Sequence, residues 1–139
     1  MKIKDIYNRE KNINIGKYLI SWDEPSCSKF QTSVKNFLYP YFKNGVVTEE
    51  FKIPSSRLRC DFLHWGRRLA IEAHGRQHDD YVEHFAGSRS GFLAAWKRDS
   101  QKRDWIENIM KFQLILIYEK DMPYLSRQWF IDEYNIDII

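Results

Sequence analysis

The residues best suited to chemistry lie within one short stretch, residues 59–78, which combines acidic and imidazole side chains. Two segments predicted to be β-strands flank Gly66-Arg67, and glycine suits a two-residue hairpin turn. With that turn, Asp61 falls directly opposite Glu72, and the two Cβ atoms would lie ~5 Å apart. The sequence therefore predicts a pair of carboxylates that face each other across one hairpin.

Two carboxylates this close repel each other, so a purely structural hairpin would gain by replacing one of them. A divalent cation removes the conflict, because hard oxygen ligands at this spacing suit Mg²⁺ (or Mn²⁺). Such an ion can activate water and stabilise charge on a phosphoryl group. We therefore predict a metal site on Asp61 and Glu72. The alternative is an ordinary surface hairpin with a solvated acidic pair.

Two histidines follow the acidic pair and could transfer protons. His74 lies two residues beyond Glu72 and shares its face of the strand, and Gly75 permits a sharp turn that brings His78 back toward the site. Either imidazole could act as a general acid or base, or donate to a phosphoryl oxygen. A zinc site is the rival interpretation, and it would draw on His64, His74, His78 and His84. Strand alternation places His64 and His74 on opposite faces, which disfavours it.

A basic segment at residues 96–105 is predicted to be helical. It could present cations to a phosphate backbone while Asp99 leans toward the acidic pair. The cationic candidates are Lys97, Arg98, Lys102 and Arg103. The alternative is a solvated helix face whose acidic and basic side chains pair with one another.

The elements that must position these residues follow from hydrophobic periodicity. Helices are expected from about Pro25-Ser26 to Asn44-Gly45, over residues 91–111, and after Pro123. Strands are expected over residues 46–53, in both hairpin arms, and over residues 114–118. This order predicts an α/β fold in which a mixed sheet is flanked by helices.

Three finer expectations concern the strands. Val47, Phe51 and Ile53 should share one face, with Glu49 as a polar misfit on it. The apolar run 114–118 suits a strand that is buried on both faces. Trp65, at the hairpin tip, is expected to be exposed and could stack on a base.

Composition limits the class of protein. A chain of 139 residues with 43% hydrophobic residues fits one domain. We expect a core over residues 25–122, an N-terminal arm over 1–24, and a C-terminal helix over 123–139 that packs on the core or makes a homodimer contact. Cys27 and Cys60 are too few for a disulfide framework or a four-cysteine zinc site, so free thiols in the cytoplasm are expected. The chain has no apolar run near the ~20 residues that span a bilayer, so no membrane association is expected.

The charge is concentrated rather than spread. The formal net charge is only +3. Residues 57–104 carry all of this surplus, so the basic side chains gather on the segment that holds the proposed chemistry. A local excess of this kind favours a polyanionic partner.

Taken together, these motifs resemble the PD-(D/E)xK nuclease superfamily. The block from Asp61-Phe through Ile-Glu-Ala-His-Gly-Arg-Gln-His78 is similar to very-short-patch-repair endonucleases, and more so to phage homing endonucleases described by an EDxHD motif. The similarity covers residues 28–120. It implies a restriction-endonuclease-like fold, double-stranded DNA as substrate, and the host-cell cytoplasm if the protein is phage-encoded.

The resemblance also implies roles for individual residues. Asp61 would be the primary metal ligand, Glu72 the second acidic residue, and the Ala73 carbonyl a further ligand. His74 would replace the lysine of the superfamily motif, and His78 would match a second histidine one residue nearer in spacing. The remaining positions are open: Asp99 or Asp104 for the acidic residue on the following helix, and Gln31, Glu49 or Glu50 for the first acidic position.

Two departures bear on the type of endonuclease. Repair enzymes of this group carry a structural zinc site, which Cys27 and Cys60 cannot supply. They also wedge aromatic side chains into DNA where this chain has Arg76 and Gln77, which suit polar contacts to bases or phosphates. A site-specific DNA endonuclease of the homing type is therefore predicted. The alternatives are a non-catalytic nucleic-acid-binding module on a nuclease-like fold, a mismatch-type nicking repair endonuclease, and an RNA-cutting nuclease.

Overall fold

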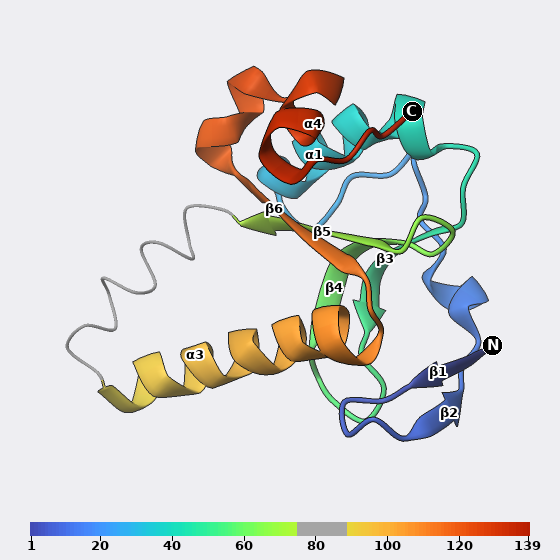
Figure 1. The fold of residues 1–139 in the computed structure, drawn as a ribbon, viewed down its shortest axis with the longest axis vertical. Coiled ribbons are helices and arrows are strands. Elements are labelled where there is room, and N and C mark those ends of the chain that lie inside the picture. The colour runs from blue at the N-terminus through green and yellow to red at the C-terminus, as the bar shows by residue number, and fades with distance from the viewer. Residues whose placement is uncertain (75–88) are drawn as a thin grey trace.

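The protein is a mixed α/β structure, seen in a computed structural model that describes residues 1–74 and 89–139, without the side chains of 89–96. A four-stranded sheet of order β3-β4-β5-β6 forms its centre, and helices cover both faces (Figure 1). In chain order the elements are β1 (Lys2–Lys4), β2 (Glu10–Asn12), the 3₁₀ turn η1 (Ile15–Tyr18), α1 (Lys29–Phe42), β3 (Val47–Lys52), β4 (Arg59–His64), β5 (Leu69–His74), α3 (Arg89–Asp104), the π-helical turn η3 (Trp105–Ile109), β6 (Gln113–Tyr118), the 3₁₀ turn η4 (Glu119–Tyr124) and α4 (Arg127–Tyr134).

The order helix, three strands, helix, strand, helix is confirmed. Strands β3, β4 and β5 are antiparallel neighbours, and β6 joins β5 in parallel after α3. Helices α1 and α4 lie on one side of the sheet, and α3 lies on the other (Figure 1). Two parallel strands that follow each other in the chain need a crossover connection, and α3 lies in the connection between β5 and β6.

The sheet separates two hydrophobic clusters. Val34 from α1 and Phe130 from α4 pack on Ile71 on one side. Trp105 and Ile106 pack on the opposite side, next to Ala70. The residues at the centre of both clusters are buried, so β5 is packed on both faces.

Helix α1 begins later than expected. Its N-cap is Ser28, whose hydroxyl oxygen accepts a hydrogen bond from the Gln31 amide at 3.0 Å. The expected cap, Ser26, instead turns its hydroxyl to the Glu49 carboxylate. The prediction of a start at Pro25-Ser26 was therefore wrong, because Ser26 has a partner on the sheet.

The register of the β4–β5 hairpin is as predicted, but its turn is longer. Phe62 pairs with Ile71 and His64 with Leu69. The connection is a four-residue loop, residues 65–68, that ends in Arg68 at φ 55°, rather than a two-residue Gly66-Arg67 turn. The same register follows from both turns, because both have the same centre.

Trp65 is not the exposed tip that was expected. Its indole N–H donates to the Thr48 hydroxyl at 3.0 Å, and its ring packs edge-on against Phe51 and Phe112. The longer loop lets the indole fold back onto the sheet, so base stacking by Trp65 is not supported.

Strand β3 changes its alternation at Glu50, which has φ 53°. Val47 packs with the α1/α4 cluster, whereas Phe51 and Ile53 pack with the α3 cluster. The prediction that these three share one face was wrong, because left-handed backbone at Glu50 reverses the side-chain direction. Glu49 and Glu50 consequently both reach toward α1.

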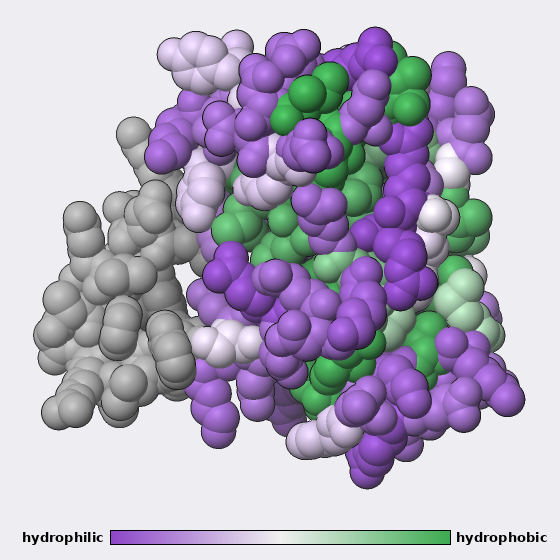
Figure 2. Space-filling model, in the orientation of Figure 1, coloured by the Kyte–Doolittle hydropathy of each residue, from purple (hydrophilic) through white to green (hydrophobic). Residues whose placement is uncertain are grey.

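Strand β6 is an edge strand, and only one of its faces is fully buried. Ile115 and Ile117 lie in the α1/α4 cluster, whereas Leu114 and Leu116 are half-buried. Figure 2 shows hydrophobic side chains at the surface in the band between α3 and the helices above it. Burial on both faces was thus a wrong expectation.

Across the described residues, no helix combines the length and the apolar character needed to cross a membrane.

Candidate active site

Asp61 and Glu72 stand side by side where the β4–β5 ladder opens. The Glu72 carboxylate accepts a hydrogen bond from the Asp61 amide at 2.9 Å. The Asp61 carboxylate accepts one from the Ala73 amide at 2.8 Å. Each carboxylate therefore takes the place of a carbonyl acceptor in the ladder, and both are fixed to backbone. The predicted opposition of Asp61 and Glu72 is confirmed.

The closeness of the two carboxylates makes it costly for both to be ionised, because like charges repel each other. Burial, followed by the charge of Glu72, raises the pKa of Asp61 well above its usual range. Glu72 itself is only 4% exposed. A buried carboxylate this close to a half-buried one is unusual in a structural hairpin and typical of sites that bind cations or transfer protons.

The pair lies in the wall of an open pocket of about 860 Å³ between α1, α3 and the strands. Its described lining combines acidic, basic and apolar side chains. The acidic ones are Glu50, Asp61, Glu72, Asp99 and Glu119, and the basic ones are Lys29, Lys102 and Arg103. Five carboxylates against three cations leave this part of the wall with an excess of negative charge.

Glu50 is the third acidic group beside the pair. The β3–β4 register pairs Glu49 with Phe62 and Phe51 with Cys60, which places Glu50 level with Asp61. Burial, then the charges of Glu50 and Asp61, raises the pKa of the Cys27 thiol, as expected if both carboxylates lie near it.

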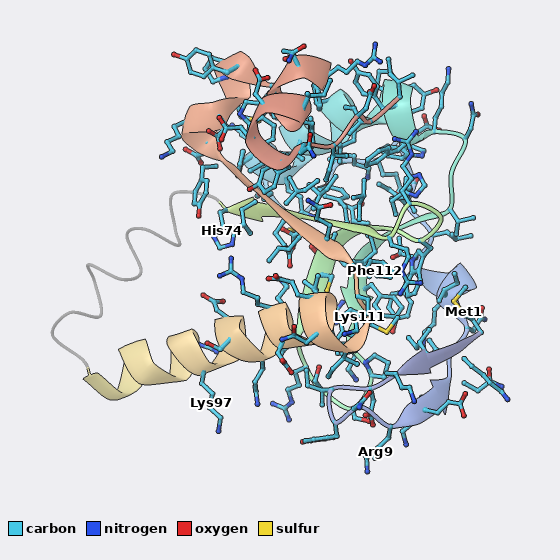
Figure 3. All side chains as sticks on the ribbon, viewed as in Figure 1. Met1, Arg9, His74, Lys97, Lys111 and Phe112 are labelled. Carbon is cyan, nitrogen blue, oxygen red and sulfur yellow. The ribbon has the colours of Figure 1, made fainter. Side chains whose placement is uncertain are left out.

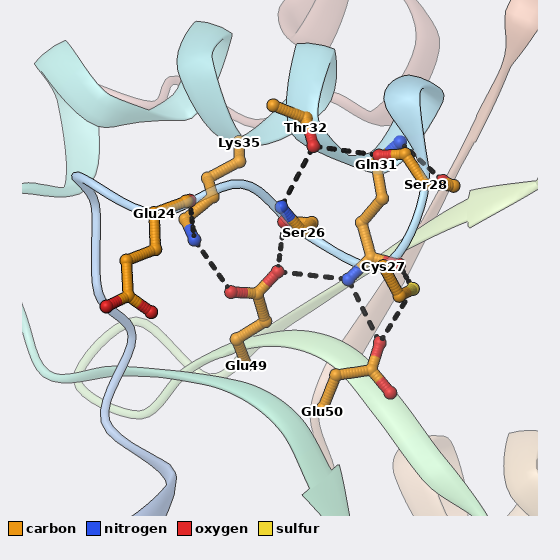
Figure 4. Close-up of polar contacts among 9 residues, drawn as sticks. All are labelled: Glu24, Ser26, Cys27, Ser28, Gln31, Thr32, Lys35, Glu49 and Glu50. Carbon is orange, nitrogen blue, oxygen red and sulfur yellow. Dashed lines mark hydrogen bonds and ion pairs between the residues drawn. The ribbon is translucent and has the colours of Figure 1, made fainter.

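A hydrogen-bond network between α1 and β3 discriminates among the candidates for the first acidic position (Figure 4). The Gln31 amide donates to both Glu49 and Glu50 at 3.0 Å. The Glu49 carboxylate also forms an ion pair at 2.9 Å with the buried ammonium of Lys35. Of Gln31, Glu49 and Glu50, the first has no charge and the second is already neutralised by Lys35. Glu50 is the one that combines a carboxylate with a place in the pocket wall.

Lys102 contacts the acidic pair directly. Its ammonium forms an ion pair with Glu72, and its side chain keeps a quarter of its surface exposed. Burial alone would lower the pKa of Lys102, but the charges of Glu72 and then Asp61 raise it above its usual value. The sequence placed Lys102 only among phosphate-binding cations, and helical spacing alone could not show that it turns toward Glu72.

His74 and Ala73 complete the end of β5. His74 lines the pocket, and its ring lies 5.4 Å from that of Tyr118. Because N–H and C=O of one residue point to the same neighbour in an antiparallel strand, the Ala73 carbonyl faces the side of β4 that holds Asp61. Both residues thus lie beside the acidic pair, and their roles as metal ligand and proton carrier stay predictions.

Helix α3 contributes unevenly to the pocket. Asp99 lines it, whereas the rival Asp104 is exposed and accepts a hydrogen bond from Asn108 at 2.8 Å. Lys97 and Arg98 do not belong to the described lining. Figure 3 shows Lys97 and His74 on opposite sides of α3. The described pocket lining therefore includes only part of the basic segment, because a helix points successive side chains in different directions.

Arg103 lies at the pocket wall but pairs with Glu107 at 3.2 Å. The remaining candidates, Arg76, Gln77 and His78, lie outside the described residues.

The donor atoms that the described residues offer fit Mg²⁺ better than zinc. Over residues 1–74 and 89–139, no group of three or more His, Cys, Asp or Glu side chains is placed to hold a metal ion. A zinc centre needs such a group, and two histidines of the zinc interpretation, His78 and His84, lie outside the described residues. Mg²⁺ needs less, because one or two carboxylates, a carbonyl and water complete its shell. Asp61, Glu72 and the Ala73 carbonyl fit that requirement.

No family model, curated protein or solved structure was found to match the chain.

Proposed function

We propose that the protein is a metal-dependent endonuclease that hydrolyses phosphodiester bonds in double-stranded DNA with Mg²⁺ or Mn²⁺. The observation that carries the proposal is the Asp61–Glu72 pair, two neighbouring carboxylates fixed to backbone in the wall of an open pocket. Buried like charges cost stability, and a site that binds a divalent cation gives a reason to keep them.

The residues that would hold the ion are Asp61, Glu72 and the Ala73 carbonyl, and Glu50 would add negative charge to the same pocket wall. When bound, a divalent cation would polarise a phosphoryl oxygen and favour ionisation of a nearby water. The two carboxylates would orient the ion, because their hydrogen bonds to the strands prevent them from turning away.

His74 is the proposed proton carrier. Its imidazole can take a proton from the attacking water or give one to the leaving oxygen near neutral pH. Its position at the end of β5, in the same pocket wall as Glu72, keeps it close to where such a water would lie. His78 is the second candidate for this role.

For the fold we propose the restriction-endonuclease-like arrangement, with site-specific cleavage of the homing type. The support is the order of elements around the sheet and the place of the acidic pair on two adjacent strands. Arg103 and Asp99 would meet substrate at the pocket, and Lys97 and Arg98 would contact flanking phosphates. Arg76 and Gln77 would make polar contacts to DNA.

A second candidate is a non-catalytic nucleic-acid-binding module on the same fold. The observation that favours it is the ion pair of Lys102 with Glu72, which offsets part of the negative charge without any metal. Such a module would still contact DNA phosphates through its basic side chains and would need no divalent metal ion.

The two candidates are separated by incubating the protein with supercoiled plasmid and with a randomised DNA library, in Mg²⁺ and in EDTA. We expect Mg²⁺-dependent cleavage, with sequenced ends that share a site. DNA binding without cleavage of any library member would support the binding module instead. Cleavage that persists in EDTA would contradict the metal-dependent mechanism.

A further inference from the structure

The charge of the acidic pair has to be balanced within the protein. Asp61 and Glu72 cannot relieve their repulsion by moving apart, because each is hydrogen-bonded to the backbone of the neighbouring strand. Glu72 is buried and Asp61 half-buried, so water screens their charges less than it would at a fully exposed site. A cation close to both carboxylates would offset this repulsion.

Lys102 meets that requirement. Its ammonium contacts Glu72, and the charge of Asp61 also acts on it. Of the other two described cations in the pocket wall, Arg103 pairs with Glu107. Lys29 stands at the first residue of α1, on another side of the pocket.

We propose that Lys102 is the resident counter-ion of the metal-free site, and that a divalent cation binds Asp61 and Glu72 by displacing the Lys102 ammonium. The inference rests on the proposed metal site but not on cleavage of DNA. A single positive charge leaves one carboxylate unbalanced, whereas a divalent cation balances both.

Displacement is sterically simple. The lysine stem has four carbons and several rotatable bonds, and a quarter of the side chain is already exposed. Once released, the ammonium remains at the pocket wall, where it can bind a phosphate oxygen. Displacement of Lys102 thus couples two events: the metal ion binds the carboxylates, and the Lys102 ammonium becomes free to bind an anionic substrate.

The first test is calorimetric titration with Mn²⁺ in the absence of DNA. Lys102→Met keeps the length of the stem and removes the charge, so the competitor is lost. We expect its Kd for Mn²⁺ to fall by about tenfold or more relative to wild type. We also expect a lower Tm in EDTA that Mn²⁺ restores. Lys52→Met is the matched control, since Lys52 is exposed on β3 and outside the described pocket wall, and its Kd should stay unchanged.

The second test uses the wild-type protein and so does not depend on how the variant folds. The side-chain NMR signals of Lys102 are followed while Mg²⁺ is added. We expect Lys102 to change from an ion-paired to a solvent-exposed signature. Lys35, paired with Glu49 under α1, should not change.

Unchanged or weaker Mn²⁺ binding by Lys102→Met, or Lys102 signals that do not respond to Mg²⁺, would overturn the inference. So would the absence of divalent binding by both proteins. Metal binding with Lys102 displacement in a protein that cleaves no DNA would uphold it while refuting the endonuclease. DNA cleavage in Mg²⁺ without displacement of Lys102 would refute this inference and uphold the endonuclease.

Discussion

The Tyr134 hydroxyl replaces a missing neighbour strand at Leu116. It accepts a hydrogen bond from the Leu116 amide at 3.0 Å and donates one to the Leu116 carbonyl at 3.1 Å. An open edge strand carries unpaired backbone groups that invite another chain to pair with it. Helix α4 thus protects the β6 edge with one phenol, and Leu116 itself lies in the pocket wall.

Tyr134→Phe removes that hydroxyl and leaves the ring in place. Two half-buried backbone groups lose their partner, so we expect a loss of about 1–3 kcal/mol in the free energy of unfolding. Urea denaturation measures it. Tyr124→Phe, at a side chain that is 71% exposed, is the control and should stay near wild type. Equal stability of both variants would show that water replaces the phenol.

Gly45→Ala tests how closely the connection between α1 and β3 approaches the β4–β5 hairpin. A Cβ at Gly45 would lie 2.4 Å from His64 Nε2, closer than any real contact. We expect a loss of about 1–3 kcal/mol in unfolding free energy, because the buried ring has little room to move. At Gly66 a Cβ would meet the same ring at an ordinary 3.5 Å, so Gly66→Ala is the matched control. Thermal unfolding of both variants decides the point.

His64 should make stability depend on pH. Burial, then the charge of Arg67, lowers the pKa of His64 in the folded protein. The unfolded chain therefore takes up this proton at a higher pH, so stability falls as pH drops below about 6.5, the ordinary histidine value. We expect Tm to rise between pH 5 and pH 7, and His64→Gln to flatten that slope. An imidazole NMR titration midpoint above 6.5 would contradict the assignment.

The buried Lys35–Glu49 ion pair predicts a cost that depends on which partner is removed. Lys35→Met leaves the Glu49 carboxylate, whose side chain is 13% exposed, without its cation. We expect a loss of about 3–5 kcal/mol in unfolding free energy, and a clearly smaller loss in Lys35→Met/Glu49→Gln. Denaturation of single and double variants forms the cycle. Equal losses in both would mean that packing, not charge, sets the cost.

The acidic pair was predictable because strand register follows from the centre of a turn. Asp61 and Glu72 remain opposed whether the connection has two residues or four, so an error in turn length left the site intact. The α/β order was predictable for a similar reason, since it depends on periodicity and not on exact helix ends.

Other features depend on long-range contacts that the local sequence does not encode. Residue types do not reveal that Glu50 adopts a positive φ, although this conformation brings both Glu49 and Glu50 to Gln31. Nor does helical spacing show that Lys102 turns to Glu72 while Lys97 points away. Both outcomes depend on how the sheet and α3 pack together.

The most direct test of the central claim is the single-turnover rate of DNA cleavage in Mg²⁺ by Asp61→Asn, with Asp104→Asn as the control. The amide keeps a hydrogen-bond acceptor for the Ala73 N–H, so the fold should survive while the charge that binds the cation is lost. We predict a rate at least about 100-fold lower for Asp61→Asn. Asp104→Asn, exposed and outside the described pocket wall, should cleave at the wild-type rate. A folded Asp61→Asn protein that cleaves as fast as wild type would contradict the account.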